Sequence, residues 1–75
     1  MHDLRTLRRS VGISQFALSI RSGVPRAKLS AVEMGEISLA SDEEAAVRKV
    51  LSRAADDRKA QISAVTNSLA IGASA

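Results

Sequence analysis

Three glycines divide the first half of this 75-residue chain into short segments, and an apolar residue follows each glycine within two positions. A glycine can adopt the left-handed conformation that closes a helix, and an apolar residue behind it commonly packs back on the last turn. Gly12, Gly23 and Gly35 therefore predict the ends of three short helices. Their spacing is too tight for a β-sheet of useful size.

Apolar spacing and a capping residue place the first two of these helices. Leu4, Leu7 and Val11 fall at i, i+3 and i+7, which predicts one helix face between about residues 3 and 11. Ser14 is suited to cap the second helix, because its hydroxyl can accept a hydrogen bond from an otherwise unpaired backbone N–H.

A capping box opens the second half of the chain. Ser41 and Glu44 stand at its two reciprocal positions, and acidic residues fill the first predicted turn, where they face the positive end of the helix dipole. Residues 42–71 contain neither Gly nor Pro. They can form one helix of roughly 45 Å, at about 1.5 Å per residue, or two helices broken near Asp56 and Asp57.

The composition limits what so short a chain can be. A domain of this size buries only about 60% of the surface of its unfolded chain. Because the sequence has no Cys, we expect support from idealised helix packing or self-association, and therefore a homodimer. No apolar run approaches the roughly 18 residues of a membrane span, and the N-terminus lacks the layout of a secretory signal. We expect a cytoplasmic protein without membrane association.

The residues offer little catalytic chemistry. His2 is the only histidine and lies at the N-terminus. Neighbouring acidic residues diverge by about 100° per position on a helix, so they do not converge on a metal or a substrate. We expect neither an enzyme nor a cofactor or metal.

Charge is distributed unevenly along the chain. Residues 1–31 carry a net charge of +5, and residues 32–75 carry −2. Phe16 is the only aromatic residue, so the chain has no stacking surface for single-stranded nucleic acid. This pattern favours duplex DNA as a polyanionic partner.

The segment before Gly35 combines an apolar side with an outer ridge of mostly small residues. At about 100° per residue, Leu29 and Val32 point to one side of a helix, with Arg26 and Lys28 on its flanks. The ridge on the other side consists of Ala27, Ser30, Ala31 and Met34. Alanine methyls can contact thymine methyls, and Arg or Lys can reach guanine or a phosphate, so this surface suits a DNA major groove.

Seven short motifs follow one another along the chain: Leu4-Arg5-Thr6-Leu7-Arg8, Gly12-Ile13-Ser14-Gln15, Leu18-Ser19, Ser22-Gly23-Val24-Pro25-Arg26, Leu29-Ser30, Val32-Glu33 and Gly35. In this order they resemble the Cro/C1-type (Xre) helix-turn-helix family of phage repressors and bacterial regulators over about residues 4–51. The resemblance implies a compact, lambda-repressor-like all-α bundle of four or five helices, with the third helix in the major groove. It divides the chain into a DNA-binding domain, residues 1–55, and a C-terminal helical extension, residues 56–75.

The resemblance also assigns roles to single positions. Gln15 matches a glutamine that bonds a phosphate or braces the recognition helix. Arg8 and Glu33 match a salt bridge between the first and third helices. The predicted DNA-binding residues are Ser14, Gln15, Pro25, Arg26, Ala27, Lys28, Ser30 and Ala31.

Two features depart from the family pattern. Pro25 stands where many relatives have a Ser or Thr cap, although its fixed φ suits the start of a helix. Glu36 and Leu39 lie in a loop that often carries phosphate-binding Lys or Arg, so the affinity for the DNA backbone should be modest.

Two apolar sets remain outside this pattern. Phe16 and Ile20 lie one turn apart on the face of the second helix away from Leu18. The C-terminal part carries an imperfect heptad seam interrupted by Arg58, made of Leu51, Ala55, Ile62, Val65 and Leu69. We predict that this seam forms a homodimer or packs on Phe16 and Ile20.

The expected function is that of a sequence-specific regulator of transcription, phage or prokaryotic, that binds double-stranded DNA. It would act as a dimer in the cytoplasm, on the nucleoid, at an operator whose half-sites lie about 34 Å apart. The alternative is an antitoxin-type module whose C-terminal helix binds a partner protein and whose DNA binding is secondary. A restriction-modification controller belongs to the first class, and the sequence does not separate it from a phage repressor.

Overall fold

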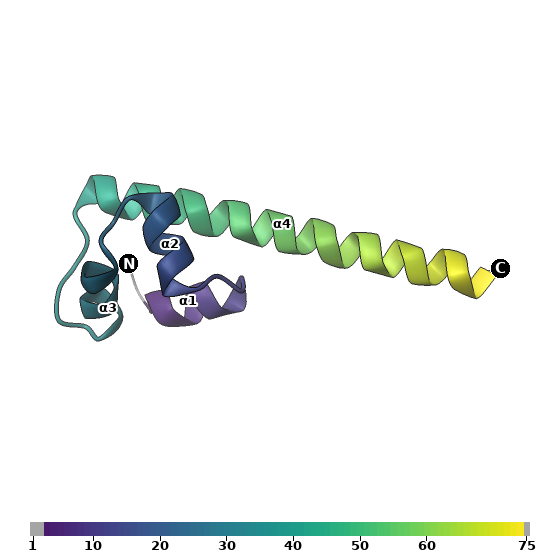
Figure 1. The fold of residues 1–75 in the computed structure, drawn as a ribbon, viewed down its shortest axis with the longest axis horizontal. Coiled ribbons are helices and arrows are strands. Elements are labelled where there is room, and N and C mark those ends of the chain that lie inside the picture. The colour runs from purple at the N-terminus through teal and green to yellow at the C-terminus, as the bar shows by residue number, and fades with distance from the viewer. Residues whose placement is uncertain (1–2, 75) are drawn as a thin grey trace.

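Four α-helices make up the described part of the chain (Figure 1). The computed structural model describes residues 3–74, with side chains described for residues 3–66. The helices are α1 (Leu4–Ser10), α2 (Gln15–Ser22), α3 (Arg26–Glu33) and α4 (Ser41–Ser74). No strand occurs in residues 3–74. The predicted all-α fold is confirmed, with four helices rather than five over these residues.

The helix ends predicted in the first half of the chain are confirmed. Gly12, Gly23 and Gly35 have φ values of 72°, 78° and 77°, the left-handed region that closes a helix. The Gly23 N–H donates to the carbonyl of Ser19 at 2.9 Å, which ends α2. At the other end of α2, the Ser14 hydroxyl accepts from the Ala17 N–H at 3.0 Å, as a capping residue should.

All four helices contribute to one small apolar core. Leu18, Leu29 and Val47 are fully buried, and Leu4 is 1% exposed. The other buried residues of the core are Ile13, Val24, Leu39 and Leu51. Leu7 departs from the predicted face of α1 and stays 45% exposed, since α1 has seven residues and buries only Leu4.

The last helix is continuous and leaves the globule. α4 spans 34 residues without a break at Asp56 and Asp57, which decides between the two arrangements that the sequence left open. In Figure 1, α1, α2 and α3 gather along the first part of α4, and the remainder of α4 extends alone. The molecule therefore measures 54 × 19 × 18 Å. Within the described residues, no helix has the length and apolar character that a membrane span requires.

The cap that precedes α4 lies one residue earlier than the predicted capping box. The Ala40 N–H, rather than that of Ser41, donates to a glutamate side chain, Oε1 of Glu43, at 3.0 Å. Glu44 accepts instead from Arg48 at 2.9 Å. Ala40 and Glu43 therefore stand where the sequence predicted Ser41 and Glu44, and the predicted position of the box is wrong by one residue.

Candidate nucleic-acid interface

The two sides of α3 differ as the sequence predicts. Leu29 is fully buried, and Val32 packs against the core. On the outer side Ala27 is exposed, and Ser30 and Ala31 are half-buried along the edges of the ridge. Met34, at the far end of the ridge, is 63% exposed, so the ridge is exposed at its two ends and half-buried between them.

A buried carboxylate joins α3 to α1. Arg8 Nε donates to Glu33 Oε2 at 2.9 Å, and Arg8 Nη2 donates to Glu33 Oε1 at 3.1 Å. The Glu33 side chain is 0% exposed, and that of Arg8 is 13% exposed. The predicted salt bridge is confirmed. Sequence reasoning missed the contribution of Arg5, whose Nε lies 3.3 Å from the same carboxylate.

This pairing keeps Glu33 ionised. Burial alone would raise the pKa of Glu33, but hydrogen bonds from Arg8, Gln15 and Arg5 outweigh it and lower that pKa below the ordinary value of 4.5. The hydrogen bond to Glu33 in turn raises the pKa of Arg8. Arg8 also donates through Nη1 to the carbonyl of Ile13 at 3.1 Å, so the same cation fixes the connection between α1 and α2.

Gln15 lies between the first turn of α3 and its buried carboxylate. Its side chain hydrogen-bonds Glu33, and its Oε1 accepts from Arg26 Nε at 3.5 Å. Of the two roles that the resemblance implies for Gln15, these contacts correspond to the brace of α3. The Ser14 oxygen accepts the capping hydrogen bond, which leaves its O–H as a donor.

Lys28 lies on the flank of α3 that faces α4. Its Nζ is 2.7 Å from Glu43 Oε1, and this pairing lowers the pKa of Glu43. In the absence of DNA, the charge of Lys28 ties α3 to the first turn of α4, and its predicted contact with bases or phosphates stays a prediction. The sequence does not show this pair, because it does not fix where α4 crosses α3.

The connection between α2 and α3 is fixed by serine hydroxyls. Ser19 Oγ donates to the carbonyl of Val24 at 2.7 Å, and Ser22 Oγ donates to the carbonyl of Leu18 at 2.6 Å. Pro25 directly precedes α3 with φ −55° and ψ 138°, and its carbonyl accepts from the Lys28 N–H at 3.0 Å. The Val24 N–H also donates to Ser22 Oγ at 3.3 Å, so both serines hold Val24 of the connection against the end of α2, and sequence reasoning did not anticipate these contacts.

The charge at the leading end of the ridge comes from one residue. Arg26 is exposed at the first position of α3, with only the long contact to Gln15. Among the described residues, no group of three His, Cys, Asp or Glu side chains is arranged to hold a metal ion. The surface therefore offers methyl groups, one hydroxyl and one exposed guanidinium, which is chemistry for contacting base edges.

The two apolar sets outside the core remain apart. Phe16 and Ile20 are 61% and 68% exposed, and α4 extends away without covering them, so the prediction that the C-terminal seam packs on them within one chain is wrong. Ile62 and Val65 are 56% and 55% exposed. The side chain of Leu69 lies outside the described residues.

Leu51 does not belong to this exposed seam. It is 8% exposed and lies in the core. The sequence prediction grouped it with the outer residues because their spacing is continuous along α4.

Comparison with known proteins finds no matching family model, no matching curated protein and no matching solved structure.

Proposed function

We propose that this chain is a sequence-specific regulator of transcription that binds double-stranded DNA, of the Cro/C1-type helix-turn-helix class. In this proposal α2, the connection at residues 23–25 and α3 form the helix-turn-helix, and α3 enters the major groove. The observation that carries it is the outward ridge of Ala27, Ser30 and Ala31, held in place by the buried Leu29.

The ridge is braced on both flanks before any DNA binds. Glu33 connects α3 to α1 through Arg8, and Lys28 connects α3 to α4 through Glu43. A surface that is already ordered loses less conformational entropy on binding. Arg26 then reaches guanine or a phosphate at the edge of the ridge, while the alanine methyls contact thymine methyls and Ser30 accepts or donates.

Dimerisation is part of the proposal, and the outer part of α4 supports it. A helix that extends without tertiary contacts is only marginally stable in water. At about 100° per residue, Ile62 and Val65 lie on the same face of α4 as Val47 and Leu51, which are buried in the core. A second copy that covers this outer face brings two α3 helices to an operator with two half-sites, separated by about 34 Å or a multiple of it. Bound over a promoter in the cytoplasm, on the nucleoid, such a dimer excludes polymerase.

A second candidate function rests on the same exposed residues. If Ile62 and Val65 contact a different protein, the chain is an antitoxin-type module whose DNA binding is secondary. Sedimentation of the purified chain separates the two: a dimer at micromolar concentration supports the regulator, and a persistent monomer supports the antitoxin-type module.

Footprinting on the DNA upstream of the chain's own gene, over a series of salt concentrations, tests the proposal. We expect a protected segment with two half-sites. We also expect log affinity to fall linearly with log salt concentration, with a slope of about −0.9 for each phosphate that the protein contacts. Equal and weak retention of upstream and scrambled duplexes at physiological salt would reject the proposed function.

A further inference from the structure

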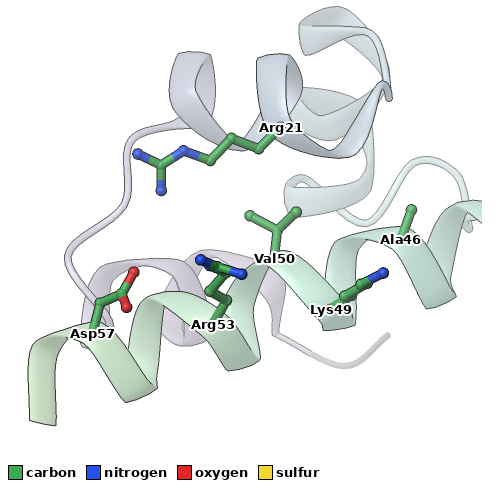
Figure 2. A pocket seen from close by; sticks show the side chains of 6 residues that line it. All are labelled: Arg21, Ala46, Lys49, Val50, Arg53 and Asp57. Atoms are coloured by element: carbon green, nitrogen blue, oxygen red, sulfur yellow. The ribbon is translucent and has the colours of Figure 1, made fainter. Parts of the chain in front are cut away.

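A groove of about 520 Å³ runs between α2 and α4, away from the α3 ridge. It is lined by Arg21 of α2 and by α4 residues Ala46, Lys49, Val50, Arg53 and Asp57 (Figure 2). In Figure 2 the Arg21 side chain reaches over the α4 turns that carry Arg53 and Asp57, and Val50 rises toward α2 between Lys49 and Arg53. No residue of α3 lines the groove.

The groove collects positive charge that the protein leaves unpaired. In the described part of the chain, none of Arg21, Lys49 and Arg53 lies in an ion pair, and Asp57 is the one carboxylate of the lining. By contrast, four other cations of the globule are paired with glutamates: Arg5, Arg8, Lys28 and Arg48.

The floor between these cations is apolar. Ala46 and Val50 line it, and Val50 is half-buried with one side against the core. Lys49 and Arg53 lie one helical turn apart, about 6 Å along α4, so their charges form an edge beside this floor.

We propose that this groove docks an acidic, amphipathic helical segment of a partner protein. Carboxylates of the segment pair with Arg21, Lys49 and Arg53, while its apolar side chains cover Val50 and Ala46, as in other helix-in-groove complexes. The lining spans residues 46–57 of α4, or about 17 Å, which accommodates about three turns of a helix. This inference does not rest on the proposed DNA binding.

The apolar floor favours a polypeptide over a DNA backbone as the occupant. A phosphate backbone pairs with cations but covers no apolar side chain, so it leaves Val50 and Ala46 without a contact. Because α3 does not line the groove, a partner docked there leaves the ridge accessible. The geometry is that of a protein that contacts a second protein through one face while another face stays open.

Titration of the isotope-labelled full chain, followed by amide chemical shifts, tests the proposal with defined probes. The main probe is a helical peptide of about 14 residues with Leu on one face and Glu on its borders. Three comparison probes are the same peptide with Lys for Glu, the same peptide with Ser for Leu, and a short duplex of scrambled sequence. We expect only the acidic amphipathic peptide to shift the amides of Arg21, Val50 and Arg53.

Charge reversal supplies the matched control. Replacing the two groove cations of α4, Lys49→Glu with Arg53→Glu, should weaken binding of the acidic peptide at least about tenfold, because like charges then face each other. The control, Lys59→Glu, reverses one charge at an exposed residue of the same helix that does not line the groove. It should change the affinity for the acidic peptide by less than about twofold.

Four results would overturn the proposal. The Ser-for-Leu peptide could bind as well as the main probe, which would reduce the site to charge alone. The duplex could shift the same amides, which would make the groove a DNA contact. The double variant could bind the peptide unchanged, or no probe could bind at millimolar concentration. If the peptide titration fails and the operator footprint is observed, only the proposal for the groove is rejected. If the peptide binds as expected and no footprint is observed, only the DNA-binding proposal is rejected.

Discussion

The two halves of α4 present the same kind of face in different surroundings. In the inner half, Val47 is fully buried and Leu51 is 8% exposed, while in the outer half Ile62 and Val65 are 56% and 55% exposed. At about 100° per residue, all four lie within roughly 60° of one another around the helix. Periodicity thus identifies an apolar face along the whole helix, but the surrounding chain determines which part of that face is buried.

The inner half also shows how charge joins the helices. Glu43 at the start of α4 pairs with Lys28 of α3, whereas Lys49 and Arg53 of α4 face the groove toward α2 without a pair among the described residues. The inner half of α4 therefore contacts α3 through the Lys28–Glu43 ion pair. On the side that faces α2 it leaves the net positive charge of the groove.

The largest effect on stability is expected when the same substitution is made at two positions of one face of α4. Val47→Asp places an unpaired charge in the core, which should cost more than about 4 kcal/mol and unfold so small a domain at 25 °C. Val65→Asp should leave the helical circular dichroism of the globule unchanged, because Val65 is exposed. Equal losses of the cooperative unfolding transition in the two variants would contradict the distinction between the halves.

The second-largest effect is expected for the Arg8–Glu33 ion pair, which joins α3 to α1 within the globule. Glu33→Gln leaves the half-buried Arg8 without its charged partner and should cost about 1–3 kcal/mol in denaturant unfolding. The pKa of Glu33 is lower in the folded protein than its ordinary value of 4.5, so the stabilisation is present above pH 4.5 and is lost as the pH falls through the folded-state pKa. The variant should lack that part of the acid dependence, and an unchanged pH profile would disprove this role of Glu33.

For the outer half, the expected effect is on association. Val65→Asp should raise the dissociation constant of the homodimer at least about tenfold, measured by sedimentation equilibrium, since it places two charges in an apolar interface. Ser63→Asp adds the same charge to the opposite side of α4 and serves as the control. If the wild-type chain stays monomeric at high micromolar concentration, a second copy does not cover the outer half.

The smallest effect tests a local contact within the globule. Ser14→Ala removes the side chain that caps α2 and should lower the free energy of unfolding by about 1 kcal/mol. Ser52→Ala, at an exposed position inside α4, should be neutral or slightly stabilising, because Ala has the higher helix propensity. A loss at Ser52 as large as that at Ser14 would indicate that the cap contributes nothing specific.

Local signals in the sequence predicted the elements, and the contacts between distant elements were harder to predict. Gly12, Gly23 and Gly35 ended helices as predicted, because a left-handed residue is a local requirement. The Arg8–Glu33 pair was reached only through a family resemblance, since nothing in a spacing of 25 residues shows that two side chains meet.

Two of the features that sequence reasoning missed share one physical origin, the placement of α4. The Lys28–Glu43 pair follows from where α4 crosses the other helices, and so does the burial of Leu51 in the core. The groove between α2 and α4, with its unpaired cations, has the same origin. An amphipathic pattern carries no information on the crossing point, so these features required the structure.

The central claim, that the outer ridge of α3 contacts base pairs, is tested most directly by one pair of substitutions in a duplex-binding assay. Ala27→Glu places a carboxylate on the ridge, and Ala45→Glu makes the same change at an exposed alanine of α4. Fluorescence anisotropy with the footprinted operator at fixed salt should show a loss of at least about a hundredfold for Ala27→Glu, roughly 2.8 kcal/mol, and less than about threefold for Ala45→Glu. Equal affinities for the two variants, with both proteins folded, would contradict the assignment of α3 as the DNA-contacting helix.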